Sequence, residues 1–170
     1  MADTATIRSA TAADVPLVLA FIRELAAYER LAHEVVATEA GVRAALFGPH
    51  PYAEVVFAYL EGAPVGFALF FHNFSTFLGK PGIYLEDLFV RPAVRGRGVG
   101  RQLLAWLART TLERGCARLD WAVLDWNAPA IGFYQSLGAV PQDDWTTYRL
   151  AGTALERLAG GAMTPDGPRG

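Results

Sequence analysis

A glycine-rich segment that joins a predicted strand to a predicted helix has residue types that suit the binding of an anion. The segment is Arg95-Gly96-Arg97-Gly98-Val99-Gly100. Glycines let the backbone approach a phosphate closely and direct several N–H groups at it, and the N-terminus of the following helix adds partial positive charge. From Leu88 to Leu112 the chain has arginines, including Arg91, but no Asp or Glu, which reinforces a positive surface. The alternative is a glycine turn with solvated arginines.

This segment does not match two common nucleotide-binding patterns. A dinucleotide-binding fingerprint requires a third glycine at position 101, where the chain has Arg101. A Walker A loop requires a Gly-Lys-Ser/Thr sequence, which does not follow here. A nucleotide-binding domain is therefore disfavoured as an alternative function.

Two adjacent carboxylates, Glu86 and Asp87, lie within an apolar segment that is predicted to be a strand. Neighbouring side chains of a strand point to opposite faces, so at least one of the two should be buried if both faces of the sheet are covered. Burial raises the pKa of a carboxyl group that has no cationic partner, and such a group can act as a base or hold a cationic substrate. The alternative is a structural ion pair with one of the arginines.

The elements that must position these residues alternate between strands and helices. Capping residues and apolar spacing predict helices at residues 15 to about 28 or 31, 38–46, 99–114 and 127–137. Runs of β-branched and aromatic residues predict strands at residues 6–8, 54–60, 65–71, 83–90, 118–124 and 145–150. Residues 61–64 are predicted to form a hairpin turn, and residues 73–82 a turn-rich stretch.

These elements predict an α/β fold with a mixed central sheet and flanking helices. The hairpin makes its two strands antiparallel, whereas the helix between strands 83–90 and 118–124 makes those two parallel. The chain has 170 residues, of which 52% are hydrophobic, so one folded domain over residues 1–158 is expected. Residues 159–170, rich in Gly and Pro, are predicted to be a flexible C-terminal tail.

Composition also bounds the partners and the location. The formal net charge of −2 argues against nucleic acid, and the longest apolar runs are far below the roughly 18 residues of a membrane span. The N-terminus has no signal-peptide pattern, and the lone Cys116 cannot form an intrachain disulfide, so a cytoplasmic location is expected. His33, His50 and His72 lack metal-ligand spacing, so no metal is expected.

Three further segments extend the glycine-rich loop into a family pattern. They are Ile22-Arg23-Glu24-Leu25-Ala26-Ala27-Tyr28-Glu29, Tyr84-Leu85-Glu86-Asp87-Leu88-Phe89-Val90 and Trp126-Asn127-Ala128-Pro129-Ala130-Ile131-Gly132-Phe133-Tyr134. Together with Arg-x-x-Gly-x-Gly between a strand and a helix, they resemble the GCN5-related N-acetyltransferases (GNAT), in the branch of the diamine (spermidine/spermine) and thialysine acetyltransferases. The resemblance covers nearly the whole chain. It implies a GNAT fold, acetyl-CoA as co-substrate, a small-molecule primary amine as acceptor and a homodimer.

The resemblance also implies which residues bind acetyl-CoA. The backbone of Leu88, Phe89 and Val90 is expected to bind the pantetheine arm and to polarise the thioester oxygen. The expected pyrophosphate residues are Arg95, Gly96, Arg97, Gly98, Val99, Gly100 and Arg101, and Asn127 and Pro129 are expected at the cofactor arm.

Acetyl transfer requires a neutral amine, and because an alkyl ammonium has a pKa of about 10.4, a base must remove a proton. The resemblance implies Glu86 as a water-assisted base and Tyr134 as the acid that protonates the departing thiolate. Without the family pattern, Tyr134 would be assigned to the core of an amphipathic helix. The residues expected at the amine are Tyr28, Glu29, Glu86, Asp143 and Trp145.

One departure from the family pattern bears on the choice of amine. Ser75-Thr76-Phe77 has no acidic residue where diamine acetyltransferases carry an Asp, and it is closer to the thialysine acetyltransferases. A long polyamine needs carboxylates for its distal ammonium groups, so a smaller amine with an amino-acid-like end is favoured. The alternative function is a non-catalytic CoA-binding sensor or interaction module, which would bind coenzyme A without releasing thiol.

Overall fold

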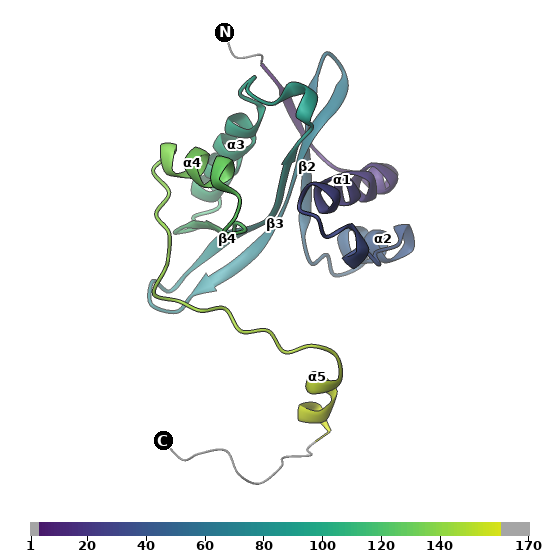
Figure 1. Cartoon of the computed structure of the whole chain (residues 1–170), viewed down its shortest axis with the longest axis vertical. Helices are drawn as coiled ribbons and strands as arrows, with labels where there is room; N and C mark the ends of the chain where they lie inside the picture. The colour runs from purple at the N-terminus through teal and green to yellow at the C-terminus, as the bar shows by residue number, and fades with distance from the viewer. Residues whose placement is uncertain (1–3, 161–170) are drawn as a thin grey trace. The chain divides into compact units, whose positions relative to one another are not determined.

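The computed structural model describes residues 4–160 of the chain (Figure 1). Contacts between residues divide the chain into two compact units, with the division between residues 122 and 123. Each unit is described by itself below. No helix among the described residues is long and apolar enough to cross a membrane.

The first unit is built on a five-stranded sheet in which the strands follow one another in chain order. The strands are β1 (Thr6–Ser9), β2 (Glu54–Leu60), β3 (Ala63–Ser75), β4 (Lys80–Val90) and β5 (Leu119–Trp121). Strands β1 to β4 pair antiparallel, and β4 pairs parallel with β5. The predicted mixed sheet with one parallel pair is therefore confirmed.

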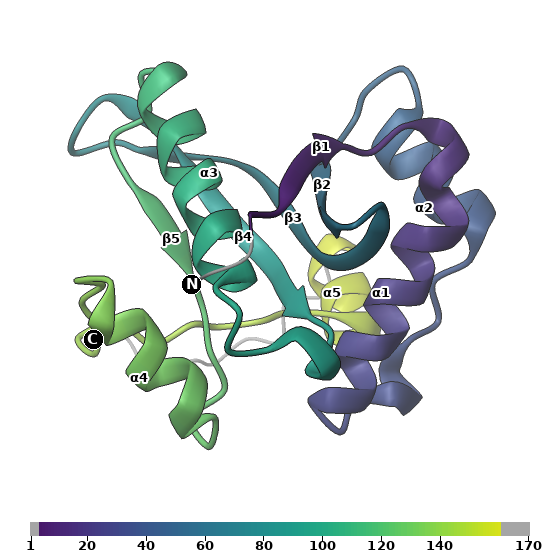
Figure 2. The same ribbon diagram turned by 90° about the horizontal axis from the view of Figure 1, so that it is seen from above.

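Helices cover both faces of this sheet, as Figure 2 shows. Helices α1 (Val15–Tyr28) and α2 (Glu39–Phe47) lie on one face, and α3 (Val99–Glu113) lies on the other. Phe21 of α1 packs between sheet residues on the first face, with its ring centroid 5.2 Å from that of Phe67. On the second face, the ring centroids of Trp106 of α3 and Phe70 of β3 lie 5.9 Å apart. Because side chains alternate between the two faces of a strand, Phe67 and Phe70 of β3 pack into the cores on opposite sides of the sheet.

Local capping explains where the helices begin. The Thr11 N–H donates to Asp14 Oδ2 at 2.7 Å, just before α1, and the Thr38 hydroxyl accepts from Gly41 N before α2. Arg8 of β1 binds both Asp14 oxygens at 2.9 Å and the Tyr59 hydroxyl at 2.6 Å. These contacts tie the start of α1 to β1 and β2.

Two strand boundaries differ from the sequence prediction. Strands β3 and β4 remain paired as far as Ser75 and Lys80, so the turn is much shorter than the predicted turn-rich stretch 73–82. Gly82 looks like a turn residue, but it lies in β4. Glycine is needed there because a Cβ would come within 2.4 Å of Asn73 Oδ1 from the facing strand. Strand β5 is shorter than the predicted 118–124, since its pairing with β4 extends only over Leu119–Trp121.

The second unit contains α4 (Ala128–Ser136) and α5 (Gly152–Ala159). As predicted, Asn127 caps α4, accepting from Ala130 N, and Gly138 follows the helix with a φ of 88°. The predicted strand at 145–150 is wrong, because no neighbouring strand pairs with it among the described residues of this unit. Helix α5 was not predicted, and Ala159 is its last residue. Residues 161–170 of the expected tail lie outside the described residues.

Candidate active site

A β-bulge in β4 places the two adjacent carboxylates. Leu69 of β3 faces Asp87, whereas the next residue, Phe70, faces Leu85, so Glu86 is the extra residue on β4. A bulge breaks the strict alternation of side chains and bends the strand locally. It leaves the Glu86 side chain exposed and Asp87 half-buried. Of Glu86 and Asp87, it is therefore Asp87 that is partly buried, as expected for at least one of them.

Asp87 is the carboxylate most strongly perturbed by its surroundings. Burial, together with the nearby charges of Glu86 and Glu29, raises the pKa of Asp87 to about 6. Burial also raises the pKa of Glu29, at the C-terminal end of α1. No arginine or lysine of the described residues pairs with Asp87, so the alternative of a structural ion pair finds no support. The charges of Glu29 and Glu86 thus act on Asp87 with no paired cation among the described residues, and these three carboxylates are called the acidic cluster below.

The sequence predicts that Glu86 or Asp87 is buried, but it does not indicate which of the two. No local signal marks the bulge, because it arises from the pairing of β4 with β3. The coupling of Asp87 to Glu29 depends on α1, which lies far away in the sequence. In the sequence, the burial of Asp87 is indicated only by its position within an apolar run.

Aromatic side chains lie beside the acidic cluster. Tyr28, which precedes Glu29, has its ring centroid 6.3 Å from that of Phe89 in β4. The guanidinium of Arg95 lies 4.3 Å from the centroid of the Tyr28 ring. Tyr28, Glu29 and Glu86, all expected at the amine, are thus brought into one region of the first unit together with Asp87.

One edge of β4 is left without a neighbouring strand beyond the bulge. The pairing of β4 with β5 ends at Leu85, whereas its pairing with β3 continues to Val90. Residues 88–90, the expected pantetheine-binding residues, lie in this stretch. An extended ligand with amide groups can add to such an edge as a further strand would, so these residues fit the expected pantetheine arm.

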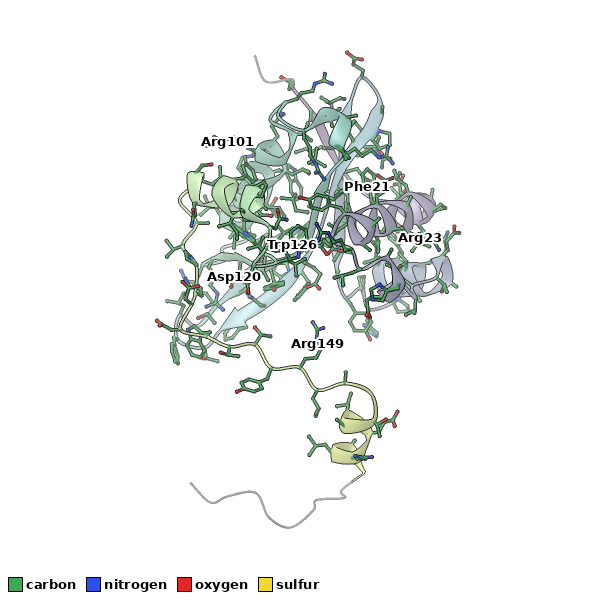
Figure 3. All side chains as sticks on the ribbon, viewed as in Figure 1. Phe21, Arg23, Arg101, Asp120, Trp126 and Arg149 are labelled. Carbon is green, nitrogen blue, oxygen red and sulfur yellow. The ribbon has the colours of Figure 1, made fainter. Side chains whose placement is uncertain are left out.

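The glycine-rich loop has the backbone geometry expected of an anion site. Gly96 and Gly98 have φ angles of 80° and 84°, in the left-handed region that favours glycine. Gly98 is the N-cap of α3 and provides no side-chain cap, so the first-turn N–H groups are left for another acceptor. Arg101 lies exposed on this first turn of α3 (Figure 3). The residues present therefore fit a pyrophosphate.

Arg91 does not add to this positive surface in the way that the sequence suggests. It donates two hydrogen bonds to Glu24, at 2.8 and 3.0 Å, and a third to the Pro64 carbonyl at 2.8 Å. Its guanidinium also lies 4.5 Å from the centroid of the Phe21 ring. Phe21 points from α1 toward the sheet, while Arg23 points away from it (Figure 3). The charge of Arg91 is thus matched by a carboxylate within the fold.

The remaining predicted residues lie in the second unit. Asn127 and Pro129 are at the start of α4, and Tyr134 is two turns further along the same helix. The rings of Phe133 and Tyr134 have centroids 5.5 Å apart. Asp143 and Trp145 lie exposed in the irregular segment after α4. The participation of these residues in the reaction stays a prediction.

The segment Ser75-Thr76-Phe77 forms the turn between β3 and β4. The Ser75 hydroxyl accepts from Leu78 N at 3.3 Å, and Phe77 is exposed. Between Lys80, at the start of β4, and Asp87 the strand rises by roughly 20 Å. Within one chain, the turn therefore does not line the acidic cluster, and it does not bear directly on the choice of amine there.

Comparisons with known proteins bear on the activity of this site. Residues 20–139 match the family model described as Acetyltransferase (GNAT) family. A thialysine N-epsilon-acetyltransferase of Bos taurus is 38% identical over 165 residues, covering 91% of this chain and 96% of that protein. An L-ornithine N5-acetyltransferase of Arabidopsis thaliana is 33% identical over 197 aligned positions, covering 89% and 86%. A solved integron cassette protein from V. cholerae has a TM-score of 0.77 at 28% identity, covering 91% of this chain and 97% of that one.

Proposed function

The chain belongs to the acetyltransferase (GNAT) family and is an enzyme that transfers an acetyl group to an amine, and we propose that its acceptor is the primary amine of a small, amino-acid-like molecule. Members of this family use acetyl-CoA as co-substrate. The non-catalytic sensor is therefore set aside. The observation that carries the proposal is the acidic cluster of Glu29, Glu86 and Asp87, which has no cationic partner among the described residues.

A cluster of this kind attracts a cation of small size. Like charges and burial both disfavour the ionised form of Asp87, and an ammonium group beside it would favour that form again. The amine arrives as an ammonium ion, so the cluster both attracts it and holds its charge until the proton is removed. Asp87 thereby anchors the ammonium, beside the aromatic rings of Tyr28 and Phe89.

The proposed chemistry divides between two residues. Glu86, exposed at the bulge, takes a proton from the bound ammonium through a water molecule. The neutral nitrogen then attacks the thioester carbonyl, so that a C–N bond forms. The nitrogen releases its extra proton to water, and the C–S bond breaks as the tetrahedral intermediate collapses. Tyr134 donates its phenolic proton to the departing thiolate, and a backbone N–H among residues 88–90 stabilises the negative charge on the carbonyl oxygen.

Binding of acetyl-CoA is assigned to the backbone features of β4 and α3. Residues 88–90 would pair with the amides of the pantetheine arm, and the N–H groups of residues 96 and 98–101 would hold the pyrophosphate, since those of Arg95 and Arg97 donate to the carbonyls of Pro92 and Val94. Asn127 and Pro129 would contact the cofactor arm. The acetyl-CoA supplies the activated acyl group, and the protein residues position it.

Two observations favour an amino-acid-like acceptor. The relatives named above are described by the amino acids thialysine and L-ornithine, which carry an amine at the end of the side chain. The acidic cluster suits one ammonium group, and Asp143 and Trp145 are proposed to meet the rest of the molecule. The choice does not depend on the turn at residues 75–77.

A homodimer in the cytoplasm is part of the same proposal. The exposed aromatic side chains of Phe77, Trp145 and Tyr148 would give such a dimer apolar surface to cover. Light scattering during gel filtration measures the mass directly. A dimer is expected, and a monomer of 18.4 kDa at micromolar concentration would contradict this part.

The function is tested by thiol release from acetyl-CoA with a panel of thialysine, lysine, ornithine, spermidine, spermine and short diamines. Saturable release with thialysine or ornithine above spermidine is expected, and a preference for spermidine would contradict an amino-acid-like acceptor. In parallel, Tyr134→Phe should lower the turnover number far more than it weakens coenzyme A binding. An unchanged turnover number would remove Tyr134 from the mechanism.

A further inference from the structure

The side chain of Arg95 turns away from the loop that its backbone begins. Its Nε donates to the Val90 carbonyl at 3.0 Å, and its guanidinium lies 4.3 Å from the centroid of the Tyr28 ring and 5.5 Å from that of Phe89. The backbone of Arg95 belongs to the loop before α3, whereas its side chain packs on the last residue of α1. One residue therefore connects the anion loop with the aromatic side of the acidic cluster.

Arg95 differs in this respect from Arg91, on the other side of the short 3₁₀ helix Pro92–Val94. Arg91 also packs on an aromatic ring, but its charge is matched by the bidentate contact with Glu24. For Arg95, the contacts found among the described residues are a carbonyl and two ring faces. A guanidinium over an aromatic face is held by attraction to the ring, and the planar group also fixes the position of the ring.

The contact with Val90 has a second consequence. The carbonyl of Val90 belongs to the stretch of β4 that lies beyond the pairing with β5. By binding this carbonyl, Arg95 holds the end of β4 beside the bulge that carries Glu86 and Asp87. A single side chain thus contacts Tyr28, Phe89 and the carbonyl of Val90.

We propose that Arg95 is a positioning residue for the acceptor amine: its guanidinium holds the Tyr28 ring and the end of β4 in place beside the acidic cluster, and does not serve as a ligand of the pyrophosphate. This inference rests on the proposed function and deepens it. It separates the role of the Arg95 side chain, which acts on the amine, from that of the glycine-rich loop that follows it, which acts on acetyl-CoA.

The test compares Arg95→Gln with Arg101→Gln, which removes an exposed arginine from the first turn of α3. Arg95→Gln should raise the KM for the amine by about threefold to thirtyfold, the range of a cation–π contact, and change the Kd for acetyl-CoA less than twofold. Arg101→Gln should raise the Kd for acetyl-CoA and leave the KM for the amine unchanged. Arg95→Lys, which keeps the charge but loses the planar fork, should fall between wild type and Arg95→Gln.

The pairing of Arg95 with Tyr28 is tested by combining Arg95→Gln with Tyr28→Leu. Because both changes break the same contact, the double variant should show little further rise in the KM for the amine over Tyr28→Leu alone. Additive effects would overturn the proposal, and so would an Arg95→Gln variant that weakens acetyl-CoA binding while leaving the KM for the amine unchanged.

The same cycle of variants is also measured by thermal unfolding, which needs no substrate. Coupling between the two changes in Tm supports the contact, and its absence overturns it. If wild-type protein releases no thiol with any amine, the proposed function fails, and the unfolding cycle still decides whether Arg95 holds Tyr28.

Discussion

Two groups of carboxylates in the first unit differ in what lies beside them. In one group, each carboxylate faces an arginine from another element. These pairs are Asp14 with Arg8, Glu24 with Arg91 and Glu54 with Arg114. In the other group, the charges of Glu29 and Glu86 act on Asp87, and none of the three pairs with an arginine or lysine of the described residues.

The pKa is lowered for Asp14 and Glu54 of the paired group and raised for Asp87 and Glu29 of the unpaired group. The Arg114 guanidinium lowers the pKa of Glu54, and Arg8 holds the pKa of Asp14 well below its usual range. Burial and like charge raise the pKa of Asp87 to about 6. The paired carboxylates tie elements together, as Glu54 of β2 does with Arg114 after α3. The unpaired group opposes folding, which is understandable if its partner is a substrate cation.

The largest effect is expected when the anchor of the unpaired group is neutralised. Asp87→Asn should lower kcat/KM for the amine by about a hundredfold, because the amide keeps the shape but cannot hold an ammonium. The matched control is Glu54→Gln, which removes a carboxylate from the paired group. Steady-state thiol release checks both variants, and Glu54→Gln should stay within about twofold of wild type.

Equal activity of the Asp87→Asn and wild-type enzymes would remove Asp87 from the amine site. The unpaired carboxylates would then have no function that distinguishes them from the paired ones.

A somewhat smaller effect is expected from acid. Because the pKa of Asp87 is raised to about 6, its charged form is lost as the pH falls through that value. We therefore expect kcat/KM for the amine to fall about tenfold for each pH unit below 6, with kcat less affected at saturating amine. In Asp87→Asn this acidic decline should shift or disappear. A decline that persists unchanged would assign it to another group.

The contrast between the groups also explains how far the sequence could predict the site. The loop at residues 95–100 could be predicted because its glycines act locally, through φ angles of 80° and 84° at Gly96 and Gly98. The raised pKa of Asp87 could not be predicted, because it depends on burial at a bulge set by β3 and on the charge of Glu29 at the end of α1. The sequence predicts that Arg91 attracts anions. It does not show that the charge of Arg91 is matched by Glu24, because Glu24 is remote in the sequence.

The fold follows the same division between local and distant causes. The helix start at Thr11 and Asp14 is a local signal, and so is the hairpin turn, where Glu61 and Gly62 have φ angles of 49° and 79°. The predicted strand 145–150 has a suitable composition, but a strand also needs a neighbour, which no local pattern specifies. The full length of β3 and β4 was missed for the same reason.

Asp87 and Glu54 should contribute to the pH dependence of stability with opposite sign. The folded pKa of Asp87 lies above the ordinary value of an aspartate, so the folded state binds more protons, and this group destabilises the fold increasingly as the pH rises from about 4 to 6. Asp87→Asn should therefore unfold at higher Tm than wild type at pH 7, with the gain vanishing near pH 4. Differential scanning calorimetry across this range measures it.

Glu54 provides the opposite case. Its folded pKa is lowered, so its stabilising contribution is present at neutral pH and is lost as the pH falls through the folded pKa. Glu54→Gln should thus have a lower Tm than wild type at pH 7 and approach it in acid. Shifts of the same sign in both variants would refute the division into two groups.

The smallest effect is expected for Glu24→Gln, in the pair nearest to the proposed site. Arg91 keeps its hydrogen bond to the Pro64 carbonyl and its packing on Phe21 when the charge of Glu24 is removed. Because both side chains of the pair are about one-third exposed, the loss in the free energy of unfolding should stay below about 1 kcal/mol in urea titrations. Thiol release should be unchanged. If Glu24→Gln instead lowered kcat/KM as far as Asp87→Asn, pairing with an arginine would no longer distinguish structural carboxylates from those that meet the substrate.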